Sequence, residues 1–177
     1  MDNKKDLYWK QNTLFGLLMG SSFCLASLIF IWSGRSVAMN PQLNNITTLL
    51  TVVGIFMGLR KYRDEALGGS ISYARAFGVG MFLLAIASIV YALYTYILYS
   101  SSSELFAMYK NHILLMIKQV YENSPMYNTL TETFNTFLMP VSIAIGEFVN
   151  HIFSGIIFTL LLAWIIKRSI PREFQQN

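Results

Sequence analysis

Charged residues are scarce in this chain of 177 residues: they make up 12% of it, while hydrophobic residues make up 54%. Soluble domains carry about 25% charged residues, so an ordinary soluble enzyme domain is excluded. Disorder is excluded as well, because aromatic residues alone amount to 15% of the chain. The length suits a single domain, which we assign to residues 1–177.

Residues that carry common site chemistry are also few. Cys24 is the only cysteine, which excludes a disulfide framework and any zinc or iron–sulfur site made of cysteines. Neither of the 2 histidines belongs to a His-Glu-x-x-His zinc motif, and the phosphate-binding Gly-x4-Gly-Lys motif is missing. We therefore expect no enzymatic activity, no cofactor and no metal. The net charge of +4 needs no nucleic acid to explain it, because the cations follow a membrane topology.

Long uncharged runs are what the sequence has instead. An apolar helix of about 20 residues crosses the hydrocarbon core of a bilayer. In lipid such a segment must be helical, since its backbone polar groups have to be satisfied internally. We therefore predict an all-α, polytopic membrane bundle with transmembrane helices at residues 13–33, 41–59, 73–99 and 140–166.

The first run has an alternative interpretation as a secretory signal peptide. Lys4, Lys5 and Lys10 would form its basic region, and residues 36–38 its cleavage site. Signal peptides have apolar cores of about 7–15 residues, and this run is longer. Its length favours an uncleaved transmembrane helix.

The cations are distributed unevenly between the two sides that four spans define. Ten of them fall on the side of the termini: Lys4, Lys5, Lys10, Arg60, Lys61, Arg63, Arg75, Lys167, Arg168 and Arg172. Three fall on the other side: Arg35, Lys110 and Lys118. Because cytoplasmic loops carry an excess of lysine and arginine, we expect both termini to be cytoplasmic. The segment 100–139 then lies outside.

That outer segment has the pattern of an amphipathic helix over residues 104–122, with apolar residues on one face and polar residues on the other. Ser101 and Glu104 have the spacing of a capping box at its start. Pro125 breaks the pattern, and a second short helix over 127–139 leads into the last span. Such a helix can cover its own bundle, lie on the outer leaflet or dock a partner. We favour the first.

Residues 60–72 form a predicted cytoplasmic hairpin between the second and third spans. Asp64 and Glu65 can pair with the cations around them. Gly68 and Gly69 allow a turn that side chains would forbid, and either Ser70 or Ser72 can cap the next helix.

This hairpin resembles the signature of a bacterial membrane family called domain of unknown function 4199. Its pattern is Gly-x-Arg-x-Tyr-Arg-Asp, a Gly-Gly pair, and an Ile-Ser-aromatic run into a glycine-containing helix. The matching residues are Gly58, Arg60, Tyr62, Arg63, Asp64, Gly68, Gly69, Ile71, Ser72, Tyr73, Phe77 and Gly78. Arg75 departs from the pattern, since an uncharged polar residue is common there. The resemblance implies a four-helix protein of the bacterial inner membrane and supplies no activity or site residue.

Glu147, Asn150 and His151 form a polar cluster in the last span. Spacings of three and four residues place them on one face of a helix. Ionisable residues inside membranes are costly and often functional, so a proton relay or ion site is one interpretation. We favour an interfacial cluster packed against other helices, with Asn44, Asn45, Thr47, Thr48 or Tyr94 as neighbours.

Small residues recur at intervals of four in the first two spans, as Gly16 with Gly20 and Gly54 with Gly58. Such pairs let two helix backbones approach closely. Packing within one chain is favoured over dimerisation.

Two functional hypotheses follow. The first is a non-enzymatic accessory or scaffold membrane protein, with the lipid bilayer and either another membrane protein or a second copy as partners. The alternative is a small transporter or channel subunit that uses Glu147 and His151.

Overall fold

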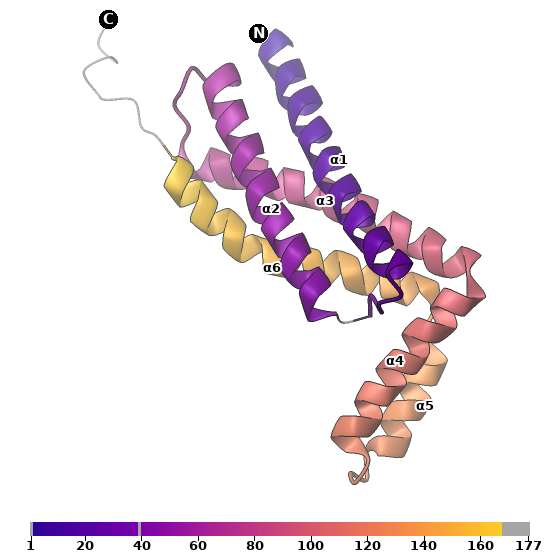
Figure 1. Ribbon diagram of the computed structural model, residues 1–177. Coiled ribbons are helices and arrows are strands. Elements are labelled where there is room, and N and C mark those ends of the chain that lie inside the picture. Colours follow the sequence, from indigo (N-terminus) through magenta and orange to yellow (C-terminus); the bar gives the residue numbers. More distant parts are fainter. Residues whose placement is uncertain (1, 39, 168–177) are drawn as a thin grey trace, which may run out of the picture.

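The computed structural model describes residues 2–38 and 40–167, and they form an all-α structure (Figure 1). The helices are α1 (Asp2–Trp32), α2 (Pro41–Lys61), α3 (Tyr73–Ser101), α4 (Ser103–Tyr121), α5 (Tyr127–Phe137) and α6 (Pro140–Ile166), with a π-helical turn η1 (Tyr62–Ala66) after α2. Four of them, α1, α2, α3 and α6, are long and apolar enough to cross a membrane, as predicted. The chain is an integral membrane protein.

The four long helices form a bundle in which α1 and α2 run side by side and α3 packs along α6 (Figure 1). The start of α1, the turn η1 and the end of α6 lie at one end, which we call the basic end. Arg63 joins η1 to the end of α6 there, because its Nη1 donates to the carbonyl of Ile166 at 3.5 Å. The α4–α5 hairpin projects from the opposite end, the hairpin end, beside the α1–α2 connection.

The centre of the bundle is closely packed and apolar. Phe23 of α1, Ile55 of α2 and Leu84 of α3 have no exposed surface. Large apolar residues such as Ile29 and Ile157 instead remain exposed on the outside of the spans. An apolar outer surface around an apolar core is what a helix bundle in lipid requires, because lipid replaces water as the solvent of these faces.

Two boundaries differ from the sequence prediction. The first span, predicted at 13–33, corresponds to Trp9–Trp32, and the helix that contains it already begins at Asp2. The second helix continues as η1 to Ala66, so that the first half of the predicted 60–72 hairpin is helical. Tyr62 and Ala66 are buried against the core, which explains why this segment keeps helical geometry.

The rest of the hairpin at the basic end agrees with its sequence. Gly68 and Gly69 have positive φ angles of 64° and 90°, a conformation that side chains disfavour. Ser72 caps α3, since its hydroxyl accepts a hydrogen bond from the backbone N–H of Arg75 at 3.4 Å. Asp64 pairs with Arg63 at 2.7 Å, and the other ion pairs of this segment are exposed.

The α4–α5 hairpin folds back on the α1–α2 connection. Ile113 and Ile117 of α4 are buried together with Ala38 of that connection. The rings of Tyr99 and Tyr109 meet edge to face at 5.1 Å and join α3 to α4. The predicted capping box at Ser101 is wrong by one residue: Ser102 is the cap, and its hydroxyl accepts from the backbone N–H of Leu105 at 3.3 Å.

Candidate functional site: a cavity beneath the α4–α5 hairpin

A cavity of about 720 Å³ lies where the hairpin meets the bundle. It reaches from the first residues of α2 and α6 to the inner surface of α5, so that it sits at the ends of the spans. Small-molecule sites in proteins commonly have volumes of about 300–1,000 Å³. The residues that matter for its chemistry are Asn44 and Thr47 of α2, Tyr91 of α3, Tyr109 of α4, Phe134 and Phe137 of α5, and Glu147, Asn150 and His151 of α6.

His151 occupies the inner wall of this cavity and is only 7% exposed. Its ring lies between Phe23 of α1 and Tyr91 of α3, with centroid distances of 5.1 Å and 4.9 Å. The side chain therefore packs against other helices and does not face lipid. This is the packing that the cost of a polar residue in lipid predicts.

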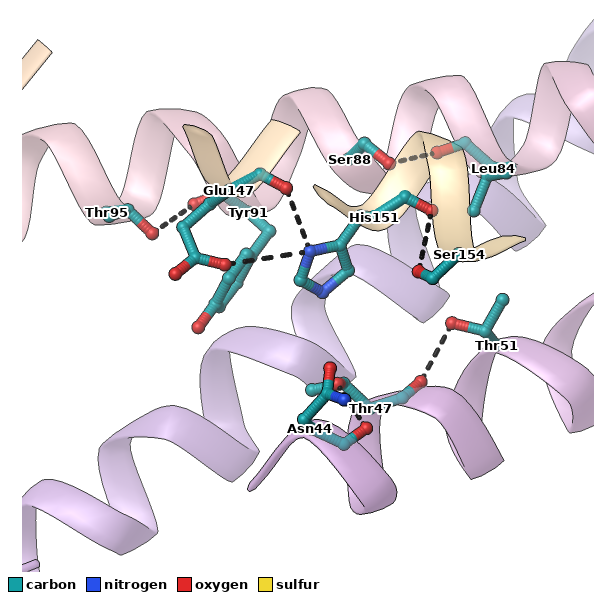
Figure 2. Close-up of polar contacts among 10 residues, drawn as sticks. All are labelled: Asn44, Thr47, Thr51, Leu84, Ser88, Tyr91, Thr95, Glu147, His151 and Ser154. Atoms are coloured by element: carbon teal, nitrogen blue, oxygen red, sulfur yellow. Dashed lines mark hydrogen bonds and ion pairs between the residues drawn. The ribbon is translucent and has the colours of Figure 1, made fainter. Parts of the chain in front are cut away.

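The hydrogen bonds of His151 define which ring nitrogen carries the proton. Nδ1 lies 3.0 Å from the backbone carbonyl of Glu147, which can only accept, so Nδ1 is the donor. The Glu147 carboxylate lies beside the same nitrogen at 3.8 Å (Figure 2). In the neutral ring Nε2 is then an acceptor, and this buried atom has no hydrogen-bond partner among the described residues.

The wall opposite His151 is the first part of α2. Figure 2 shows Asn44 and Thr47 across from the ring, on the side away from the Glu147 carboxylate. The Thr47 hydroxyl donates to the carbonyl of Asn44 at 3.0 Å. Asn44 and Asn150 are exposed residues that line the cavity, and their side-chain amides make no hydrogen bond to any described residue.

The charge of the cavity is one-sided. Glu147 contributes a carboxylate whose side chain is 24% exposed, and no lysine or arginine of the described chain lines the cavity. Tyr109 on the hairpin remains a neutral phenol, because burial and then the nearby Glu147 raise its pKa to about 12. Glu147 is thus the one acidic residue and His151 the one basic residue among the described residues that line the cavity.

Buried hydroxyls extend from the cavity toward the centre of the bundle, but each is bonded within its own helix. Thr51, Ser88 and Thr95 donate to carbonyls one turn earlier at 2.8, 2.8 and 2.9 Å (Figure 2). Thr159 does the same at 2.7 Å. These donors form no chain that leads from Glu147 to the basic end.

The structure brings together only part of the residues that the sequence singled out. Glu147, Asn150 and His151 share the cavity with Asn44 and Thr47, as the helical spacing predicts. Three expected neighbours are not among the cavity-lining residues, namely Asn45, Thr48 and Tyr94. The family-signature residues, from Gly58 to Gly78, lie at the basic end, where Tyr62 is buried in the core. Arg168 and Arg172 lie outside the described residues.

Sequence reasoning missed the part of the site that the hairpin contributes. Tyr109, Phe134 and Phe137 line the cavity, although they stand far from Glu147 along the chain. Residues 127–139 are expected to form a second short helix, and the amphipathic pattern of residues 104–122 predicts a helix that buries one face. It does not say which surface of the bundle that face meets.

Comparison with known protein families identifies one that matches this chain. The match covers residues 14–168, which include most of α1 and every other helix, and the family is described as Protein of unknown function (DUF4199). Searches for similar curated proteins and for similar solved structures found no match. The match is continuous across the bundle, the signature hairpin and the α4–α5 hairpin, and this integral membrane protein therefore belongs to the DUF4199 family.

Proposed function

We propose that this protein is a non-enzymatic accessory protein of the bacterial inner membrane that acts by binding at its hairpin end. The observation that carries the proposal is the cavity beneath the α4–α5 hairpin, which combines a carboxylate and two free amides with aromatic walls. Convergent polar groups in an otherwise apolar cavity are typical of binding sites.

The orientation of the bundle is part of the proposal. The described cations Lys10, Arg60, Lys61, Arg63, Arg75 and Lys167 stand on the elements of the basic end. The positive-inside rule supports a cytoplasmic location for that end and for both termini. The cavity then opens on the extracytoplasmic side of the membrane.

A transporter or channel subunit is the second candidate, and the position of Glu147 inside a span favours it. Two features weigh against it. The buried hydroxyls donate to their own helices and offer no relay. The apolar core that contains Phe23, Ile55 and Leu84 separates the cavity from Arg75 at the basic end.

Proteoliposomes distinguish the two candidates. We expect the purified protein to give no more proton or sodium flux than empty liposomes, with or without Glu147→Gln. Flux that depends on the protein and is abolished by Glu147→Gln would replace the binding proposal with the transporter.

The accessory role is tested in native membranes. A stoichiometric membrane partner should co-purify with the full chain and be lost when residues 103–137 are replaced by a short flexible linker. Glu132→Gln, on an exposed part of α5, is the control that should keep the partner. A partner retained by the linker variant would contradict a role for the hairpin end.

A further inference from the structure

We infer that the cavity beneath the α4–α5 hairpin binds a hydrophobic cation, meaning an amine or quaternary ammonium compound with an apolar body. The inference rests on the proposed binding role of this cavity and assigns its ligand class. Three independent observations on the cavity walls carry it: their charge, their aromatic residues and the unpartnered acceptor of His151.

The charge of the cavity selects the sign of the ligand. The Glu147 carboxylate faces the cavity, and no lysine or arginine of the described residues lines it. His151 Nδ1 lies 3.8 Å from this carboxylate, and that nitrogen already donates to the Glu147 carbonyl. An ammonium group would supply the missing positive charge. A phosphate or carboxylate would instead be repelled, which excludes anionic ligands.

The aromatic walls select a cation with an apolar body. The lining includes Tyr91 of α3, Tyr109 of α4, and Phe134 and Phe137 of α5. Aromatic rings attract cations through their π faces and at the same time bury apolar surface. A strongly hydrated metal ion would gain little from four such rings, whereas an organic ammonium ion would gain from all of them.

His151 supplies the third observation. The side chain is 7% exposed, lines the cavity and leaves Nε2 without a hydrogen-bond partner among the described residues. A buried acceptor without a donor is costly in a folded protein. Because Nδ1 holds the proton, Nε2 is an acceptor that the N–H of a protonated amine would satisfy. A quaternary ammonium or phosphonium ion has no such donor and would use the Glu147 carboxylate and the aromatic rings alone.

The test uses two ions of the same shape and opposite charge, tetraphenylphosphonium and tetraphenylborate. The full chain is placed in nanodiscs of zwitterionic lipid, and binding is measured by equilibrium dialysis against empty nanodiscs. We expect one saturable site for the phosphonium ion and none for the borate. The inference would be overturned if both ions bound equally at a saturable site, or if neither ion bound.

Matched variants locate the site. Glu147→Gln should weaken phosphonium binding at least tenfold, while Glu132→Gln, which removes an exposed carboxylate of α5, should leave it unchanged. Gly146→Leu is the second variant, because a Cβ at this cavity-lining glycine meets nothing within 4 Å. The leucine should project into the cavity and weaken binding in a folded protein. Undiminished binding to either cavity variant would refute the assignment.

The outcomes separate this inference from the proposed function. If the protein neither binds the phosphonium ion nor gives ion flux, the assigned ligand class is wrong and the accessory role still stands. If the protein binds the phosphonium ion and also gives flux that Glu147→Gln abolishes, the cation site stands. The accessory role is then replaced by transport.

Discussion

The contact between α1 and α3 depends on glycines, and Gly20 gives the sharpest test of it. A Cβ at Gly20 would lie 2.7 Å from the Cβ of Val90 and 2.9 Å from the carbonyl oxygen of Ala87. Both neighbours are backbone or directly attached to it, so no side-chain rotation relieves the clash. We therefore expect Gly20→Ala to force the two helices apart.

The magnitude follows from the distances. The 2.7 Å approach to Val90 is about 0.8 Å closer than an ordinary carbon–carbon contact of about 3.5 Å. A helix shift of that size forfeits about a quarter to a half of each attractive contact across the interface. Overpacking of this kind costs about 1–3 kcal/mol of folding stability.

A matched glycine removes the complication of helix propensity. Replacing glycine by alanine inside a helix stabilises it by about 1 kcal/mol, which would mask part of the loss. Gly78 lies in α3, and a Cβ there meets nothing within 4 Å, so Gly78→Ala gains the propensity without the clash. The difference between the two variants should therefore be about 1–3 kcal/mol, with Gly20→Ala the less stable.

The measurement is the free energy of unfolding from a reversible titration with sodium dodecyl sulfate in mixed micelles, followed by circular dichroism. Equal stability of the two variants would refute the close approach of α1 and α3. Analytical ultracentrifugation of the same samples tests the alternative that the pair Gly16 and Gly20 serves dimerisation. A dimer that Gly20→Ala dissociates would assign the pair to contacts between chains.

Three further predictions concern the two ends of the bundle. Reporter fusions after the last residue and near Asn123 should report opposite sides of the membrane, with the former cytoplasmic; the same side for both would contradict four spans. Simultaneous replacement of Arg60, Lys61 and Arg63 by glutamine should impair insertion, because each cation contributes about 1 kcal/mol at an anionic surface; normal insertion with loss of a defined partner would make this loop a docking site. Asn12→Leu should raise the free energy of unfolding by about 1–3 kcal/mol. The reason is that Asn12 has 0% exposure and its amide has no hydrogen-bond partner among the described residues. A loss of stability would show that the amide is satisfied in the membrane.

The spans and the two hairpin helices could be predicted from the sequence because local chemistry determines them. An uncharged run long enough to cross lipid must be helical, because its backbone polar groups have to be satisfied within the segment. Pro125 and the amphipathic pattern place the break between α4 and α5 within a few residues. The early start of α1 at Asp2 was not predictable from hydropathy, because polar and apolar residues extend a helix equally well outside the bilayer.

The cavity could be predicted only in part, because it depends on tertiary packing. Helical spacing places Glu147 and His151 on one face, and the cost of polar groups in lipid turns that face inward. The same reasoning does not distinguish Asn44 from Asn45, which are adjacent in sequence and point in different directions. Asn44 lines the cavity, and Asn45 is not among its lining residues.

The polar residues of the spans differ in how their side chains are hydrogen-bonded. Hydroxyl residues such as Ser88, Thr95 and Thr159 are satisfied by carbonyls of their own helices, so packing alone explains them. The exposed amides of Asn44 and Asn150 line the cavity and make no bond of this kind. Packing does not require these amides, whereas a ligand in the cavity would use them. Buried side-chain atoms without a partner among the described residues occur near both ends of the bundle, in Gln11 and Asn12 of α1 and in His151 at the cavity. A binding role for the hairpin end accounts for the one in His151.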